Sequence, residues 1–566
     1  MNKGNGCRKR IMKKSMAAML GLSLAVTGIP EQGLLAKAEH AAENKEERTD
    51  VMVVQNAAAT DIKNVIYMVP DGGGFPSYDI AKAVKEAGGI NYGGTKQTAN
   101  KMYLDEYLIG NITTRSADNE TTDSAAGGTA LACGNRTNNE VVGLTTDGKP
   151  MANILEMCQM QDKATGIIVN SYTSDATPAA FTSHTSNRKD YKQIIEQMAS
   201  QNINLVWGGC VKQRCGYGDK FEVPKKKGYT CVSDKSSLAK EVKKTYGDPS
   251  TELKLWADFA KGGEYQIAYD IGYGKNYDGY DDGDRHTPTM AEMMDNAIDL
   301  LSQDQDGFFL MMEGSKVDYS NHHGKMTESV GEWIAFDEAF KVALDFAKGR
   351  QDTMIVVAPD HNTGLTATPD SSKMQKVVEK VKNNQDTSGA KDLLSFAASS
   401  PEYPHTSMNG GLWMYLPGGV PTFKETISVN ENNPMRGGFT AANTDIPKYI
   451  AAVIADDTVK SLSDATSKLF YDVTDMGKVN NGTFRFNDYN ASVTFNSDEL
   501  NIEGTPENSR GEINIYNNGK VFISQYAYQL ATGQILEDSD LNKLEGKGTK
   551  EEPYQIASAE DFVKFT

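Results

Sequence analysis

Short runs of continuous apolar residues recur along the middle of the chain. They occupy residues 65–69, 164–169, 308–312 and 354–358. Stretches with the spacing of amphipathic helices lie between them, for example at 291–301 and 332–347. Continuous apolar strands that alternate with helices predict an α/β fold, with a mostly parallel central sheet covered by helices on both faces. Ligands of such folds bind at the carboxyl ends of the strands.

The pattern changes near residue 473, where apolar and polar residues begin to alternate. Residues 483–486, 491–495 and 512–516 alternate in this way and are separated by turns rich in Asn and Gly. This pattern predicts a small all-β module of antiparallel strands. The predicted organisation is a main α/β domain over 61–472, the β module over 473–545 and, over 546–566, the start of a repeat similar to those of bacterial surface proteins.

The first 38 residues contain the three parts of a secretory signal peptide in the expected order. A basic head is followed by an apolar run over 16–29 and by Ala36-Lys37-Ala38, which has the small residues of a cleavage site. Residues 39–60 are polar and aperiodic, so we expect a flexible leader there. The chain has no run of 18 apolar residues, and no transmembrane helix is predicted. These features predict a secreted protein, with association with the cell surface as a further hypothesis.

Composition and charge exclude several classes of protein. A hydrophobic content of 39% with only 18 prolines in 566 residues excludes a disordered or collagen-like chain. Of the 58 basic and 76 acidic residues the signal peptide holds seven and one, so the mature chain would have a net charge of −24. Such an acidic chain is not expected to have nucleic acid as a dedicated partner. Five cysteines remain after cleavage, too few for a disulfide scaffold, and Cys210, Cys215 and Cys231 are either partly bridged or all free.

Histidines are scarce, and several lie beside carboxylates near predicted strand ends. Asp360 and His361 directly follow the run at 354–358. Asp318 and His322 follow the run at 308–312, and a helix after Val317 would bring both side chains to one face. A single Asp-His pair is weak evidence, but the same arrangement after two strands predicts a metal site.

Two further segments have features of a phosphate site. Ser124 begins a run of small residues, which suits a tightly packed helix whose first N–H groups face an anion, although a simple serine N-cap explains the local pattern as well. Pro178 marks a turn, and an apolar-periodic helix is expected to follow it toward Arg188. A guanidinium group can donate two parallel hydrogen bonds to a phosphoryl group, although a lone arginine is usually a surface charge.

Together these segments resemble the alkaline phosphatase family across residues 61–470. The matching pieces are V-I-Y-M-V-P-D-G-G-G at 65–74, T-D-S-A-A-G-G-T-A-L-A at 122–132, D-A-T-P-A-A-F at 175–181, H-T-S-N-R at 184–188, E-G-S-K-V-D-Y-S-N-H at 313–322, P-D-H at 359–361, P-H-T at 404–406 and N-T-D-I at 443–446. The resemblance implies a metal-dependent phosphomonoesterase that hydrolyses small phosphate monoesters through a phosphoserine intermediate. It also implies a homodimer, without indicating the interface.

The resemblance assigns a role to each matching residue. Ser124 would be the nucleophile, Arg188 would hold the phosphate, and Asp123 would orient Arg188. One Zn²⁺ would be bound by Asp318, His322 and His405, and a second by Asp71, Asp360 and His361. A third site, for Mg²⁺, would use Asp71, Thr177 and Glu313, with Asp175 acting through water. Nitrogen-rich ligand sets suit zinc, and an all-oxygen set suits magnesium.

Two departures from the family pattern affect these expectations. Tyr319 follows Asp318 where relatives often have Lys, His or Trp, so the third metal and the pH optimum are open. Trp207-Gly208-Gly209-Cys210 replaces a Gly-Gly-Gly turn, which would bring Cys210 near the entrance of the active site.

Three other functions are alternatives. A phosphodiesterase of the same superfamily usually lacks the arginine that corresponds to Arg188, and a sulfatase needs a C-x-P-x-R motif, which this sequence does not contain. A surface-binding protein on an inactive phosphatase scaffold would have lost ligands or the nucleophile, and none of these is replaced here. A contact of the β module with the cell wall or surface is a separate hypothesis.

Overall fold

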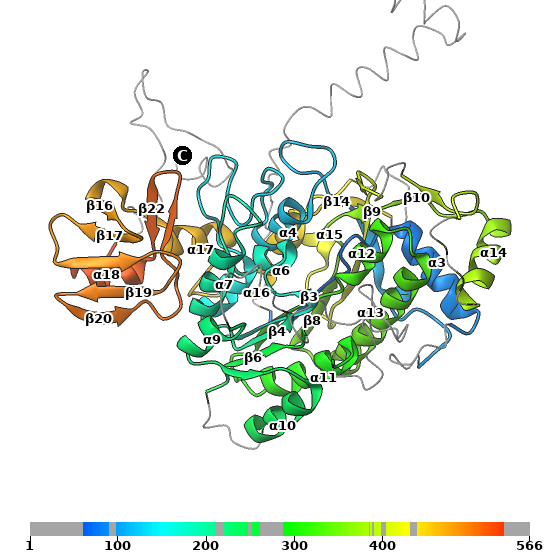
Figure 1. Ribbon diagram of the computed structural model, residues 1–566, viewed down its shortest axis with the longest axis horizontal. Helices are drawn as coiled ribbons and strands as arrows, with labels where there is room; N and C mark the ends of the chain where they lie inside the picture. Colours follow the sequence, from blue (N-terminus) through cyan, green and yellow to red (C-terminus); the bar gives the residue numbers. More distant parts are fainter. Residues whose placement is uncertain are drawn as a thin grey trace, which may run out of the picture. The chain divides into compact units, whose positions relative to one another are not determined.

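A large mixed sheet forms the centre of the protein. The computed structural model describes residues 60–89, 98–209, 219–246, 252–260, 287–383, 385, 387, 390–397, 403–430 and 438–536. The sheet has ten strands in the order β14-β2-β13-β8-β1-β7-β3-β4-β6-β5 (Figure 1). The strands are β1 (Asn64–Val69), β2 (Leu108–Thr113), β3 (Ala164–Tyr172), β4 (Leu205–Gly209), β5 (Thr230–Val232), β6 (Leu255–Asp258), β7 (Phe308–Glu313), β8 (Thr353–Val357), β13 (Gly410–Tyr415) and β14 (Thr440–Ala442).

Most pairings in this sheet are parallel, as the continuous apolar runs predict. Strand β1 lies between β7 and β8 and pairs with both in parallel. Strand β13 is antiparallel to both of its neighbours. Every residue of β1, β7 and β8 is buried, because helices cover both faces and no face of these strands meets water.

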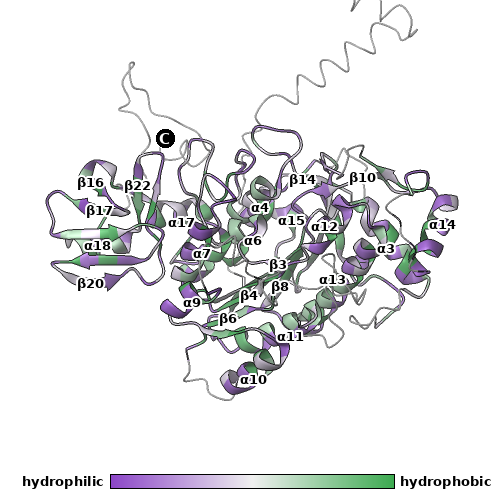
Figure 2. Cartoon of the chain, in the orientation of Figure 1, coloured by the Kyte–Doolittle hydropathy of each residue, from purple (hydrophilic) through white to green (hydrophobic). Residues whose placement is uncertain are grey.

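Helices pack on the two faces through alternate residues of the strands. On one face, Ile66 and Met68 of β1 join a core that includes Trp333 and other residues of the long helix α13. On the other face, the ring of Tyr67 packs edge-on against that of Phe181, with 5.4 Å between centroids. Figure 2 shows the apolar colour concentrated on the strands and on the inner sides of the helices. In the described residues before 470 the α-helices are α3 (Phe75–Glu86), α4 (Ser124–Cys133), α5 (Ile154–Met160), α6 (Ala176–Ala180), α7 (Tyr191–Ser200), α9 (Glu222–Lys226), α10 (Lys235–Tyr246), α11 (Met290–Leu301), α12 (Lys316–His322), α13 (Met326–Ala347), α14 (Ser371–Lys382), α15 (Phe423–Thr426), α16 (Asp445–Ile454) and α17 (Leu462–Leu469).

One predicted helix is wrong. The helix expected after Pro178 and toward Arg188 is absent, because the short helix α6 contains Pro178 and ends at Ala180. Polar groups then hold an irregular chain: the Thr182 hydroxyl donates to the carbonyl of Pro178, and the His184 N–H donates to the side chain of Gln197. Side-chain hydrogen bonds of this kind compete with the helical ones.

The C-terminal part forms small antiparallel sheets, as predicted. A five-stranded sheet contains β16 (Gly477–Asn480), β17 (Thr483–Phe486), β18 (Ala491–Thr494), β19 (Glu499–Ile502) and β20 (Thr505–Asn508). A three-stranded sheet contains β15 (Tyr471–Asp472), β21 (Ile515–Asn517) and β22 (Lys520–Ile523). Helix α18 (Gln525–Thr532), which the sequence pattern did not predict, contributes Ala527 and Tyr528 to a core with Phe484 and Val493.

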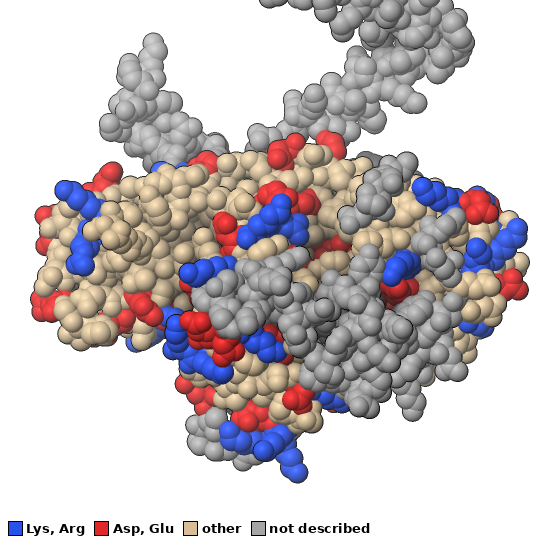
Figure 3. Space-filling view, in the orientation of Figure 1, with Lys and Arg blue, Asp and Glu red and all other residues tan. Residues whose placement is uncertain are grey.

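Polar contacts join this C-terminal part to the main α/β part of the chain. The Lys227 ammonium donates to the carboxylates of Asp498 and Glu499 at 3.2 and 2.8 Å. The Gln197 amide donates to the Asn496 side chain at 3.0 Å. On the face drawn in Figure 3, acidic and basic side chains are mixed over both parts. The predicted domain boundaries remain predictions, since these contacts cross the boundary near 473.

Several sequence-based predictions lie outside the described residues. These are the signal peptide over 1–38, nearly all of the leader over 39–60, the repeat over 546–566, Cys210 and Cys215. Cys231 is described and is a free thiol. No helix in the described part of the chain combines the length and apolarity that crossing a bilayer requires.

A partly buried carboxyl in the C-terminal part, that of Glu512, predicts a pH-dependent stability. Burial raises the pKa of Glu512 from 4.5 to about 7. The folded state therefore holds this proton more tightly, and the contribution to stability is present below pH 4.5 and is lost as the pH rises through 7. A difference of this size corresponds to at most about 3 kcal/mol.

We therefore expect Glu512→Gln, which cannot ionise, to gain stability relative to the parent protein between pH 5 and pH 8. Urea unfolding of both proteins at the two pH values measures the change. Glu507→Gln, at an exposed position on β20, is the matched control and should show no such gain. Equal effects of Glu512→Gln at both pH values would contradict the expectation.

Candidate active site

Three acidic residues meet at the carboxyl ends of adjacent strands. Asp71 lies two residues after β1, Glu313 ends β7, and Asp360 lies shortly after β8. The parallel register pairs Val69 with Glu313 and so aligns these ends. Asp71, Glu313 and Asp360 are all buried. They lie at the carboxyl ends of the strands, where ligands of such sheets bind.

Ser124 is the first residue of helix α4 and lies beside these carboxylates. The Asp123 side chain caps the helix by accepting a hydrogen bond from the Ala126 N–H at 3.0 Å. Glycine allows the helix to approach closely, because a Cβ at Gly127 would lie only 2.8 Å from the backbone oxygen of Asp360. The small-residue run thus fixes the nucleophile candidate against the end of β8.

One cluster contains Asp318, His322 and His405, whose ligand atoms lie within 4.8 Å of one another. Asp318 and His322 are one turn apart on α12, so the expected helix after Val317 is present. The Nε2 atoms of the two histidines are 3.1 Å apart. Their Nδ1 atoms bond to backbone carbonyls, at Tyr403 for His322 and Thr122 for His405, which turns both Nε2 atoms toward the cluster.

A second cluster contains Asp71, Asp360 and His361, again within 4.8 Å. The Nε2 of His361 lies 3.4 Å from Asp71, 3.1 Å from Asp360 and 3.1 Å from the Ser124 hydroxyl oxygen. The rings of His361 and His405 stack with 3.6 Å between centroids, so the two clusters are in direct contact.

The charges of the second cluster favour a bound cation. Burial, and then the Asp318 carboxylate, raise the pKa of Asp360 to about 7, and burial and Asp360 raise that of Asp71. Burial and the neighbouring His405 lower the pKa of His361. Buried oxygens of Asp71 and Asp360 have no hydrogen-bond partner. A divalent cation would supply the missing partner and allow both carboxyls to ionise.

The third predicted set lies next to the second. Thr177 is in α6, and its buried hydroxyl has no partner, nor does one carboxylate oxygen of Glu313. Burial and the Asp175 carboxylate raise the pKa of Glu313 to about 8. Asp71, Thr177 and Glu313 therefore offer oxygens alone, with at least one unsatisfied atom on each residue.

Arg188 lies beside Ser124 on the irregular segment that replaces the expected helix. Its guanidinium donates to Asp123 at 3.0 Å and to Asp175 at 3.3 Å. Although burial alone would lower it, the carboxylates of Asp175 and Asp123 raise the pKa of Arg188, so the side chain stays charged. The same Asp123 oxygen accepts from the Glu140 N–H, which fixes its orientation.

The chain is similar in sequence to known proteins over most of the part that contains this site. A family model described as alkaline phosphatase matches residues 62–411. The chain belongs to the alkaline phosphatase family. Alkaline phosphatase 4 of Bacillus subtilis is 30% identical over 364 residues, which cover 62% of this chain and 70% of the relative. The alkaline phosphatase of Escherichia coli is 29% identical over 337 residues, covering 53% and 70%.

Solved alkaline phosphatases share the fold. The enzyme from the Antarctic bacterium TAB5 aligns with a TM-score of 0.50 and 25% identity over 70% of this chain and 99% of that one. The Thermus thermophilus alkaline phosphatase aligns with a TM-score of 0.53 at 19% identity, over 73% and 96%, and supports the fold alone. The predicted family, α/β fold and alkaline phosphatase enzyme class are therefore confirmed.

The structure also brings two further side chains to the site: Thr363, which no sequence pattern singled out, and Tyr319, whose position the family resemblance relates to the third metal. The Thr363 hydroxyl donates to Asp318 at 2.6 Å and lies 3.1 Å from Nδ1 of His361, so it touches both clusters. The Tyr319 hydroxyl donates to Asp175 at 2.8 Å. Tyr319 was noted as a departure from the family pattern, whereas a threonine two residues after a histidine carries no sequence signal.

Proposed function

We propose that the chain hydrolyses phosphate monoesters, with Ser124 as the nucleophile. The observation that carries this proposal is the position of the Ser124 hydroxyl, 3.1 Å from His361 at the second cluster and at the start of a helix. The N–H groups at a helix start favour an anion, and the Arg188 guanidinium lies beside them, held by Asp123.

We assign Zn²⁺ to the two histidine-containing clusters and Mg²⁺ to the all-oxygen set. The donor chemistry supports this, because imidazole nitrogens suit zinc and hard oxygens suit magnesium. A variant of the TAB5 alkaline phosphatase has been solved with Mg bound in its M3 site. When bound, such cations lower the pKa of a neighbouring hydroxyl and neutralise charge on the entering and leaving oxygens.

In the proposed reaction the chain's own residues position the ester and accept the phosphoryl group. The Ser124 oxygen attacks phosphorus, the ester P–O bond breaks, and the alcohol leaves with a proton. Water then attacks phosphorus of the phosphoserine, which releases phosphate and restores the Ser124 hydroxyl. The Arg188 guanidinium and the first N–H groups of α4 donate to the equatorial phosphoryl oxygens in both steps.

Arg188 also favours a monoester over a diester. A monoester presents oxygens with two negative charges, which a bidentate guanidinium matches, whereas a diester presents one.

Export through the predicted signal peptide, assembly as a homodimer and contact of the β module with the cell surface remain further parts of the proposal.

Metal analysis of the mature protein, paired with hydrolysis of p-nitrophenyl phosphate, tests the proposal. We expect about two zinc ions and one magnesium ion per chain. Chelation should abolish activity, and added zinc should restore it. Bound metal with activity toward bis-p-nitrophenyl phosphate alone would favour the phosphodiesterase. A folded protein without metal or activity would favour the inactive scaffold.

A further inference from the structure

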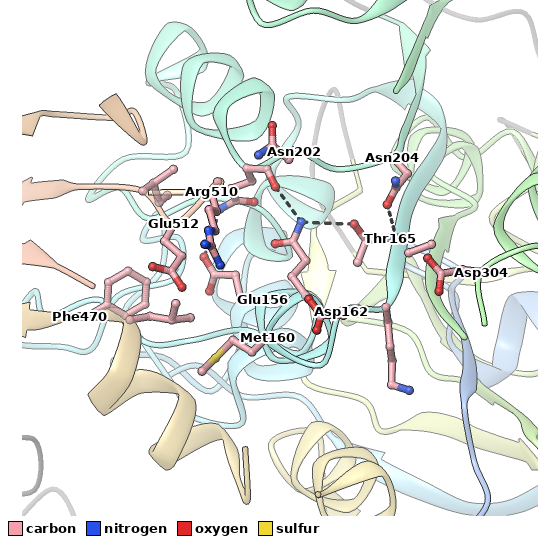
Figure 4. A pocket seen from close by; sticks show the side chains of 17 residues that line it. Glu156, Met160, Asp162, Thr165, Asn202, Asn204, Asp304, Phe470, Arg510 and Glu512 are labelled. Atoms are coloured by element: carbon pink, nitrogen blue, oxygen red, sulfur yellow. Dashed lines mark hydrogen bonds between the residues drawn. The ribbon is translucent and has the colours of Figure 1, made fainter. Parts of the chain in front are cut away.

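A pocket of about 380 Å³ lies where the C-terminal part meets the catalytic part. Its walls come from α5, the start of β3, the residues after α7, and the segment that contains Arg510 and Glu512 (Figure 4). We call it the seam pocket. The two parts approach closely here, since a Cβ at Gly511 would lie 2.9 Å from the backbone of Gln201.

The seam pocket is remote from the active site. Thr165, in its wall, is the second residue of β3, whereas Asp175 follows the other end of that strand. At about 3.3 Å per residue, the strand separates the two by roughly 25 Å. A ligand of this pocket would therefore occupy a second, independent site.

Two hydrogen-bond acceptors in the pocket lack a partner. One oxygen of Glu512 and the side-chain oxygen of Gln201 are both buried and unbonded. The orientation of the Gln201 amide is fixed, because its nitrogen donates to the Glu156 carboxylate at 3.1 Å. Figure 4 shows Glu512, Arg510 and Glu156 directed toward the same part of the pocket. Buried acceptors left unbonded are costly, so a ligand that donates hydrogen bonds would be stabilised here.

The remaining lining is acidic overall and carries an apolar wall. The charged side chains are Glu156, Asp162, Asp304 and Glu512 against Lys163 and Arg510. Glu156 is already paired with His184 at 2.9 Å, so Glu512 is the acidic group that remains for a cationic donor. Phe470 and Met160 form an apolar wall. Such a wall suits the C–H face of a small ring, and the volume is within the range of small-molecule sites.

We propose that the seam pocket binds a small amine that also carries hydroxyl groups, such as an amino sugar. The ammonium group would donate to the Glu512 carboxylate, and a hydroxyl would donate to the Gln201 oxygen. The ring would lie against Phe470. Arg510, which Figure 4 shows beside Glu512, would remain a competing cation, and its guanidinium lies over the ring of Tyr526 at 4.5 Å.

Calorimetric titration of the mature, metal-loaded protein with D-glucosamine tests this proposal. We expect saturable binding that is at least about tenfold tighter than that of glucose or N-acetylglucosamine, which lack the charge. Hydrolysis of p-nitrophenyl phosphate should be unchanged at saturation, which distinguishes this site from the active site.

Two variants with opposite expected effects keep the test independent of folding. Glu512→Gln should weaken glucosamine binding about tenfold or more, and Arg510→Gln should tighten it by removing a like charge. Glu507→Gln, which makes the same change at an exposed position, is the control and should bind as the parent does. The absence of saturable binding, equal binding of glucose, or equal affinities of the parent and Arg510→Gln would each overturn the proposal.

Discussion

Replacing Ser124 by alanine is expected to reduce turnover of a phosphate monoester by roughly 10³-fold or more. Without the hydroxyl, water must attack the ester directly, and the step that forms phosphoserine is lost. The rest of the site should stay in place, because α4 is capped by Asp123 and packs through Gly127. Steady-state kinetics gives the loss in kcat.

Trapping with ³²P-labelled phosphate at acid pH reports the phosphoserine separately. The parent protein should retain label after denaturation, and Ser124→Ala should not. Thr122→Ala is a control in the same segment, since only the backbone carbonyl of Thr122 contacts His405. Near-normal turnover of Ser124→Ala, or label retained on it, would remove Ser124 from the role of nucleophile.

His361→Ala is expected to be much more severe than Arg188→Ala. His361 lies within 3.4 Å of Asp71, Asp360 and Ser124. Its loss removes one ligand of the proposed cation, and without the cation the two carboxylates repel each other. We expect turnover to fall by roughly 10³-fold or more, with loss of about one zinc ion per chain.

In the proposed roles Arg188 binds phosphate without holding the cation, so its loss should cost roughly 10² in kcat/KM with metal content unchanged.

Elemental analysis and kinetics on the two variants separate these effects. Arg188→Lys is a useful third variant, because it keeps the charge and loses the bidentate geometry, and it should recover only part of the activity. Inhibition by inorganic phosphate should weaken in Arg188→Ala. If the two alanine variants lost activity equally and both kept their metal, the division between phosphate binding and cation binding would be wrong.

The central fold could be predicted because its strands are buried on both faces. Continuous apolar runs at β1, β3, β7 and β8 follow directly from that burial. The helix toward Arg188 could not be predicted correctly, because the backbone there depends on a hydrogen bond from the His184 N–H to Gln197, which lies on the following helix α7. Helix α18 could not be predicted, because only Ala527, Tyr528 and Ala531 of its eight residues are buried, which leaves a weak helical period in the sequence.

The candidate site was predictable where its residues follow strand ends in the sequence. Asp360 and His361 are adjacent, and Asp318 and His322 are one helical turn apart, so local spacing brings each pair together. The contact between the two pairs depends on the sheet order, and the bridging role of Thr363 depends on the fold of the loop after β8. The seam pocket combines segments from residues 156 to 513, which no local pattern relates.

The close approach of α4 to the end of β8 bears on how this enzyme tolerates mutation. At Gly127 the contact is between two main chains, with no side chain between them. The position of Ser124 relative to Asp360 and His361 is therefore set mainly by backbone geometry. Exchanges in the surrounding side chains can therefore accumulate while Ser124, Asp360 and His361 keep their separation.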